Sequence, residues 1–150
     1  MEQFKSRDHS INADLARLKE ARDFAERAAE EFGFDSSGTY QLKLAMSEAV
    51  TNAIQHGSSS EDDPIEMRVE AQGDALVFYV KDTGRFVERP AAGGDALPEQ
   101  GRGLEFMRRL MDDVNLRPGE KGTLLRFAKR PGSGGFGSAS GGFGSAGSGS

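Results

Sequence analysis

Glu48, Asn52 and His56 are spaced four residues apart, so on a helix each lies one turn beyond the last on a single strip. A carboxylate and a carboxamide placed in this way can face one cavity. Asn52 offers a neutral oxygen to Mg²⁺, and Glu48 can accept a proton from a hydroxyl group or from water. On an amphipathic helix such a strip is usually the solvated face, so the spacing indicates a site only with support from other motifs.

A second motif, Asp82-Thr83-Gly84, directly follows an apolar run at residues 75–81. The end of a strand is a common position for ligand contacts. An aspartate there can accept a hydrogen bond from an adenine amino group, and Gly84 allows the base to approach the backbone. The alternative interpretation is a simple Asp-x-Gly turn without a ligand.

The third motif is the glycine-rich segment Gly101-Arg102-Gly103-Leu104. Helical spacing of apolar residues begins at Gly103, so we expect the glycines to form a loop that opens into a helix. Free amides and the positive end of the helix dipole favour phosphate at such a place, and Arg102 adds a positive charge. A flexible hinge is the alternative.

Two helices are expected ahead of these strands and loops. The earlier one begins after an N-cap at Asn12 or Asp14 and ends at Gly33. The second runs from about residue 39 to residue 56 and is closed by Gly57. Its apolar stripe lies beside the strip that holds Glu48 and comprises Leu42, Met46, Ala49, Val50 and Ala53.

Five strands are expected from strand-like runs and from the turns between them, and the run at residues 65–71 alternates cleanly between apolar and charged residues. An edge strand at residues 4–11 comes first, a hairpin through residues 72–74 follows, and a loop at 83–100 precedes the last helix at 103–111. The order of these strands and helices along the chain predicts an α/β fold. We expect an α+β two-layer sandwich with a mixed, mostly antiparallel sheet and helices on one face. The remaining strands lie at residues 65–71, 75–81, 114–117 and 123–129.

The composition limits the domain organisation and the kind of site. We expect one domain at residues 1–130 and a disordered Gly/Ser/Phe-rich tail at 131–150, because the tail lacks the apolar surface to offset ordering. The absence of cysteine excludes disulfides, thiolate metal sites and a cysteine nucleophile. His9 and His56 are too far apart for the common zinc-ligand pairs.

Charge and hydropathy narrow the expected partners. The formal net charge of −5 argues against a broad basic face, so we expect no direct nucleic-acid binding. The sequence has no run of about 20 apolar residues and no apolar leader at its start, so we expect no membrane span and a cytoplasmic protein.

Taken together, the motifs resemble those of the GHKL (Bergerat-fold) ATP-binding superfamily, and within it the RsbW-type branch of anti-sigma factors and serine-protein kinases. Residues 47–57 resemble the N box of that family, Asp82-Thr83-Gly84 its first glycine box, and Gly101-Arg102-Gly103-Leu104 its second. Thr123, after Gly122, matches a late threonine of the family. The resemblance extends over about residues 12–129, and the motifs occur in the family's order.

The resemblance implies ATP and Mg²⁺ as cofactors and a role for each matching residue. Glu48 would be the general base and Asn52 the magnesium ligand. Asp82 would bind the adenine, with Gly84 as its backbone neighbour and Thr123 assisting at the base.

The phosphate side of the site is implied in the same way. Gly101, Arg102, Gly103 and Leu104 would border the triphosphate, and residues 83–100 would form a lid over it. The first glycine box departs from the family pattern, because Gly84 is followed at once by Arg85-Phe86, one residue shorter than in many relatives. His56 is common in this branch but receives no role.

The implied activity is that of an ATP-dependent protein serine kinase which is also a partner-switching regulator. It would phosphorylate a serine of a STAS-like anti-sigma factor antagonist and bind a sigma factor, and many relatives form homodimers. One alternative is a nucleotide-dependent binding module without phosphoryl transfer. Another is the catalytic domain of a histidine kinase, for which the only upstream histidine, His9, lies in a short polar segment.

Overall fold

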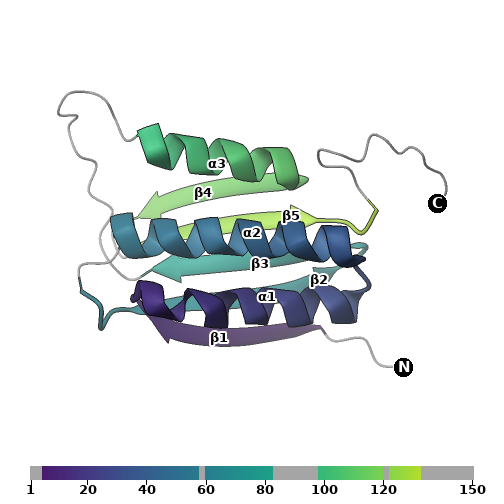
Figure 1. Ribbon diagram of the computed structural model, residues 1–150, viewed down its shortest axis with the longest axis horizontal. Helices are drawn as coiled ribbons and strands as arrows, with labels where there is room; N and C mark the ends of the chain where they lie inside the picture. The colour runs from purple at the N-terminus through teal and green to yellow at the C-terminus, as the bar shows by residue number, and fades with distance from the viewer. Residues whose placement is uncertain (1–4, 58–59, 83–97, 120–121, 133–150) are drawn as a thin grey trace.

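The computed structural model describes residues 5–57, 60–82, 98–119 and 122–132. It is a two-layer sandwich in which three helices cover one face of a five-stranded sheet (Figure 1), as the sequence predicts. The elements in chain order are β1 (Ser6–Asn12), η1 (Leu15–Arg17), α1 (Leu18–Phe32), α2 (Ser36–Asn52), η2 (Ala53–Gly57), β2 (Pro64–Gln72), β3 (Ala75–Asp82), α3 (Pro98–Leu110), β4 (Asp113–Gly119) and β5 (Gly122–Lys129).

The strands follow the order β1-β2-β3-β5-β4, and each neighbouring pair is antiparallel. The prediction of a mixed sheet is therefore corrected to an antiparallel one within the described residues. The β2–β3 connection is a tight hairpin, in which Gly73 adopts a φ of 61° that favours glycine. Such short connections join antiparallel neighbours, whereas a parallel pair needs a crossover.

The first two helices have clear start and stop signals. Gly33 ends α1 in the left-handed region, with φ 111°, as the sequence predicts. The helix α2 begins at Ser36, three residues before the expected start, because the Asp35 carboxylate accepts a hydrogen bond from the Gly38 N–H at 2.8 Å. This N-cap satisfies one of the free amides of the first turn.

The hydrophobic core lies between the sheet and the helices. The rings of Phe78 on β3 and Phe127 on β5 stack at its centre, with centroids 5.2 Å apart. Both are fully buried, as is Met107, through which α3 joins the same core. Each such side chain stabilises the fold by roughly 1.5–3 kcal/mol through burial.

The helix α3 differs from the sequence expectation at its start. It begins at Pro98, five residues before Gly103, so residues 101–103 lie within the helix and the prediction that they form a loop is wrong. Proline is well tolerated in a first helical turn, where its missing N–H costs nothing.

No helix in the described part of the chain is long and apolar enough to cross a membrane.

The far end of α3 is held by a buried lysine. Lys129 on β5 is 2% exposed, and its Nζ donates a hydrogen bond to the Leu110 carbonyl oxygen at 2.9 Å. Burial lowers the pKa of Lys129, while the charges of Asp112 and Asp35 act in the opposite direction. The amine thus satisfies a carbonyl in the last turn of α3.

The outer face of the sheet carries a continuous polar network. Its hydrogen bonds cross all five strands, so polar side chains on this face largely satisfy one another. Tyr79 hydrogen-bonds the Arg126 guanidinium and thereby raises the pKa of Arg126. From β1 to β4 the network runs through Asp8, Arg68, Glu70, Gln72, Tyr79, Arg126 and Asp113.

Candidate functional site

The contact between α2 and α3 brings two of the sequence motifs together. Gly103 is buried against α2, and a Cβ atom added to it would lie 2.6 Å from Glu48 Oε1 and 3.8 Å from Asn52 Nδ2. The backbone of the Gly101-Arg102-Gly103-Leu104 motif therefore lies directly against the Glu48 carboxylate and the Asn52 carboxamide of α2. Only glycine leaves the Glu48 carboxylate in this position.

Glu48 and Asn52 lie on the side of α2 that faces α3. Both are half-buried, and they lie one helical turn apart. This placement differs from the fully solvated strip that the spacing alone would allow. The two side chains are thus positioned by a neighbouring helix while remaining accessible to a ligand.

A second cluster lies where β3 ends beside β5. Asp82 is the last residue of β3 and only 3% exposed, and its Oδ1 accepts a hydrogen bond from the Thr123 N–H at 3.2 Å. Thr123 is also buried, and its Oγ1 has no hydrogen-bond partner within the described residues. A buried hydroxyl without a partner is costly, so an external group that pairs with it would stabilise the site.

The two clusters lie at the same end of the molecule. The helix α2 ends at Asn52 and continues into the π-helical turn η2, which packs against β3 and β5. In Figure 1 the carboxyl end of α2 lies over the arrowhead of β3, where Asp82 is located. Single π-helical turns are frequent at functional sites.

Several predicted site residues are described only in part. Gly84 and residues 83–97 of the predicted lid lie outside the described residues. Gly101 and Arg102 belong to α3 by their backbone, and their side-chain surroundings lie outside the description as well. Leu104 packs half-buried against the core, so its side chain supports α3.

The described residues contain no cluster of three or more His, Asp or Glu side chains that could hold a metal ion.

Sequence reasoning missed two long-range contacts, one that shapes the site and one that holds the far end of α3. The close approach of Gly103 to Glu48 joins residues 55 positions apart, which no local pattern reveals. The buried Lys129 had a signal, because the alternation Thr123, Leu125, Phe127 places residue 129 on the core-facing side of its strand. That inward lysine indicates a partner inside the fold.

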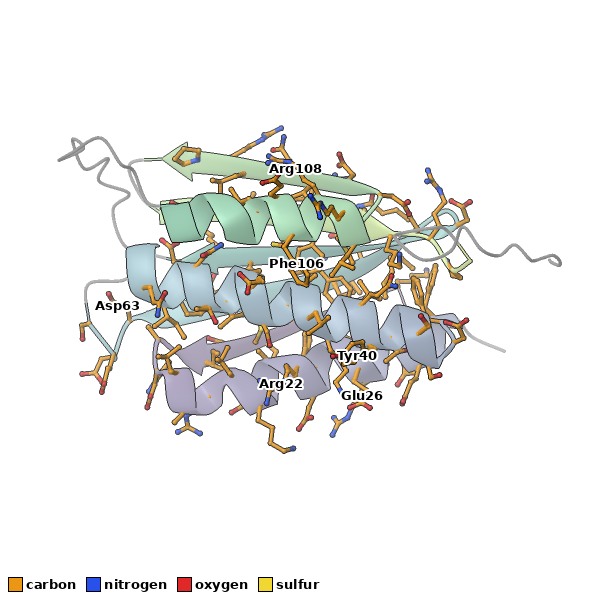
Figure 2. The ribbon with its side chains drawn as sticks, turned by 45° about the horizontal axis from the view of Figure 1, so that its top comes forward. Arg22, Glu26, Tyr40, Asp63, Phe106 and Arg108 are labelled. Carbon is orange, nitrogen blue, oxygen red and sulfur yellow. The ribbon has the colours of Figure 1, made fainter. Side chains whose placement is uncertain are left out.

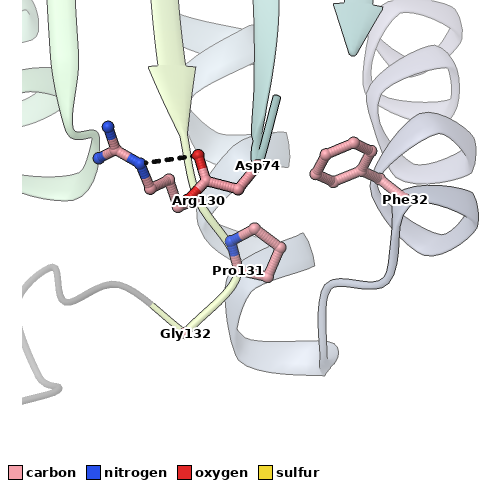
Figure 3. A pocket seen from close by; sticks show the side chains of 5 residues that line it. All are labelled: Phe32, Asp74, Arg130, Pro131 and Gly132. Atoms are coloured by element: carbon pink, nitrogen blue, oxygen red, sulfur yellow. Dashed lines mark hydrogen bonds and ion pairs between the residues drawn. The ribbon is translucent and has the colours of Figure 1, made fainter. Parts of the chain in front are cut away.

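A separate hollow lies at the opposite end of the sheet, beside the β2–β3 turn (Figure 3). It is lined by Phe32, Asp74, Arg130, Pro131 and Gly132, and Arg130 Nε donates to Asp74 Oδ1 at 3.1 Å. Asp74 precedes β3 and Asp82 ends it, so the length of that strand separates the hollow from the candidate site.

Comparisons with known proteins show what this chain is similar to. Residues 11–129 match the histidine kinase-like ATPase domain family. The serine-protein kinase RsbW of Bacillus licheniformis is 33% identical over 101 residues, and that of Bacillus subtilis 32% over 101. Each alignment covers 59% of this chain and 63% of the relative, so the chain spans just under two thirds of these relatives. The RsbW of Bacillus mycoides is 29% identical over 136 residues, which is 83% of this chain and 85% of the relative.

Solved structures share the fold. The RsbU and RsbW domains of Rv1364c from Mycobacterium tuberculosis superpose with a TM-score of 0.66 at 21% identity, over 85% of this chain and 32% of that one. The histidine kinase domain of a blue-light-activated kinase from Erythrobacter litoralis gives a TM-score of 0.52 at 18% identity, over 80% of this chain and 61% of that one.

Proposed function

Because the chain belongs to the histidine kinase-like ATPase domain family, we propose that it is an ATP-dependent protein serine kinase of the RsbW type. The relatives named serine-protein kinase RsbW support this activity. The observation that carries the proposal is the contact of Gly103 with Glu48 and Asn52. It brings the Glu48 carboxylate and the Asn52 carboxamide against the Gly103 backbone, at the same end of the molecule as the buried Asp82–Thr123 pair.

The buried pair fits an adenine. A carboxylate has several acceptor positions, so Asp82 can accept from the adenine amino group while Oδ1 holds the Thr123 N–H. The unpaired Thr123 hydroxyl can donate to a ring nitrogen of the base. The burial of both groups strengthens these hydrogen bonds relative to water.

The phosphates and the metal fit the α2–α3 contact. Asn52 would bind Mg²⁺ through its amide oxygen, with phosphate oxygens and water completing the coordination. When bound, the ion neutralises negative charge on the transferring phosphoryl group. Arg102 would contribute positive charge from α3.

Glu48 would act as the base toward the acceptor serine. Its carboxylate accepts the hydroxyl proton as the serine oxygen bonds to the terminal phosphorus of ATP, and the bond to the ADP oxygen breaks. General-base catalysis of this kind contributes typically about 10²–10⁴-fold in rate. The absent side chain of Gly103 gives the carboxylate the room that this role requires.

The proposed biological role is partner switching. The protein would phosphorylate a serine on a STAS-like anti-sigma factor antagonist and sequester a sigma factor when the antagonist is phosphorylated. It would act as a homodimer and without direct contact to nucleic acid. The basis is the activity for which the RsbW relatives are named, serine-protein kinase, together with the acidic net charge of −5.

The test is transfer of radioactive γ-phosphate from ATP to a STAS-like antagonist protein of the same organism. We expect Glu48→Gln to lower the transfer rate by roughly 10²–10⁴-fold and to leave the affinity for a non-hydrolysable ATP analogue within about threefold. Glu105→Gln on the exposed face of α3 is the matched control and should transfer normally.

Undiminished transfer by Glu48→Gln would contradict the assigned base. If the wild-type protein binds nucleotide and antagonist without any transfer, the chain is instead a nucleotide-dependent binding module. Calorimetry with both ligands beside the kinase assay separates these two functions.

A further inference from the structure

The helix α3 presents an exposed aromatic side chain next to the candidate site. Phe106 follows Gly103 by three residues, so both lie on the same side of the helix. The rise between them along the axis is about 4.5 Å. Phe106 is nevertheless 40% exposed, although a phenylalanine that served only the core would be buried.

Exposed large apolar side chains occur only on the helical side of the described chain. They are Leu15, Tyr40 and Phe106, in η1, α2 and α3. The outer sheet face carries the polar network instead. Figure 2 shows Phe106 on α3 and Tyr40 on α2, and Tyr40 lies eight residues, about 12 Å, from Glu48 along its helix.

Two arginines beside Phe106 give this part of α3 a positive charge. Arg108 and Arg109 are exposed, and within the described residues neither takes part in an ion pair. Glu105 is the one acidic residue between Gly103 and Leu110. This part of α3 therefore keeps an excess of positive charge in a chain with a net charge of −5. Unpaired arginines next to an aromatic side chain are a common composition of protein-binding surfaces.

We propose that Phe106 and Arg109 form the docking site for the segment of the substrate protein that carries the acceptor serine. This inference rests on the proposed kinase function. Gly103, Phe106 and Arg109 follow each other at intervals of three residues, so they form an inclined row that turns by about 60° around the helix at each step and leads away from Glu48 toward solvent. The row fits a segment with an apolar side chain followed by an acidic one.

The spacing of the row defines the sequence of that segment. An extended chain rises about 3.3 Å per residue, so the 4.5 Å from Gly103 to Phe106 corresponds to one or two residues. Arg109 lies about 9 Å from Gly103 along the axis, which corresponds to about three residues. The apolar residue is therefore one or two positions from the serine, and the acidic residue about three.

The experiment measures binding of fluorescent nine-residue peptides to the full chain in the presence of Mg²⁺ and a non-hydrolysable ATP analogue. Each peptide has one serine, a leucine one position away and an aspartate three positions away, in either chain direction, so that the leucine and the aspartate lie on one face of the extended segment. We expect Phe106→Ala and Arg109→Glu each to weaken binding of the better peptide at least about tenfold, or about 1.4 kcal/mol. Phe106→Leu should restore most of the affinity.

The controls are Tyr40→Ala, which removes an exposed aromatic residue elsewhere on the helical side, and Arg22→Glu on α1. Both should leave peptide affinity within twofold. A lysine-for-aspartate peptide should bind much more weakly than the acidic one.

Three results would overturn the docking site: neither peptide binds, Phe106→Ala and Tyr40→Ala have equal effects, or a single-stranded oligonucleotide displaces the peptide as well as an acidic competitor peptide does. Because the nucleotide is not hydrolysed, this readout is independent of catalysis. A wild-type protein that binds the peptide yet transfers no phosphate refutes the kinase function alone. A kinase whose peptide affinity ignores Phe106 refutes the docking site alone.

Discussion

At the scale of single residues, the candidate site depends on a side chain that is absent. A methyl group on Gly103 would approach Glu48 Oε1 to 2.6 Å, well inside van der Waals contact. The atom that it meets is the far end of a flexible side chain, so Glu48 would rotate away while the helices stay in place. Glycine at position 103 is therefore needed for the position of the Glu48 carboxylate and is not needed for the fold.

Gly103→Ala should separate activity from stability. Alanine is the better helix former by about 1 kcal/mol, so we expect an unchanged or slightly higher melting temperature. Phosphoryl transfer should fall at least about tenfold, since a small displacement of a catalytic group has such effects.

A double-mutant cycle supplies the control for that prediction. Glu48→Ala combined with Gly103→Ala should be no slower than Glu48→Ala alone, because the two changes act through the same carboxylate. Additive losses would show that Gly103 acts by another route.

At the scale of elements, α3 is held at its middle and at its end by different means. Gly103, in the middle of the helix, packs on α2, and the Lys129 amine holds the Leu110 carbonyl in the last turn. Since burial lowers the pKa of Lys129, the unfolded chain binds more protons than the folded chain between the lowered value and about 10.4. Over that window the free energy of unfolding rises with pH.

Lys129→Met should remove this pH dependence. Methionine keeps much of the apolar stem and carries no proton, so the stability of the wild type relative to the variant should increase as pH rises toward about 10.4. Urea unfolding of both proteins at several alkaline pH values measures the difference. A difference that is constant or falls with pH would contradict the inferred burial of charge.

The elements themselves were largely predictable from sequence, and the differences have local causes. Strand-like runs of residues located all five strands, and Gly33 and Gly73 marked the end of α1 and the β2–β3 turn as expected. The predicted start of α2 was three residues too late, because the Asp35 cap extends the helix into a segment that looks like a loop in the sequence. The start of α3 was wrong because glycine-rich sequence favours a loop, whereas packing against α2 holds residues 101–103 in a helix.

At the scale of the whole molecule, a single core joins the helices to the sheet, and the two faces of the sheet have different roles. The inner face packs on the helices through the stacked pair Phe78 and Phe127.

The family itself was predicted from three motifs and is confirmed by the match over residues 11–129. The roles of Glu48, Asn52 and Asp82 stay predictions, and the predicted disorder of the tail concerns residues beyond 132, outside the described part.

Phe78→Ala should lower the stability of the entire domain, because it opens a cavity at the centre of this core. The expected loss is about 3–5 kcal/mol in the free energy of unfolding, measured by urea denaturation with circular dichroism. Tyr40→Ala, at an exposed position on α2, is the comparison and should change stability by less than about 0.5 kcal/mol. A loss below about 1 kcal/mol for Phe78→Ala would show that the layers are not packed as described.

The hydrogen bond between Asp82 and Thr123 joins residues 41 positions apart in the chain. Contacts of such long range form only after a costly loop closure, whereas the β2–β3 hairpin and the α1–α2 pair can form from nearby residues. The adenine end of the proposed site is thus absent from any folding intermediate in which β5 has not yet joined β3. A chain in which β5 has not yet paired with β3 would therefore lack the proposed adenine contacts, and a bound nucleotide would stabilise only molecules in which this pairing has formed.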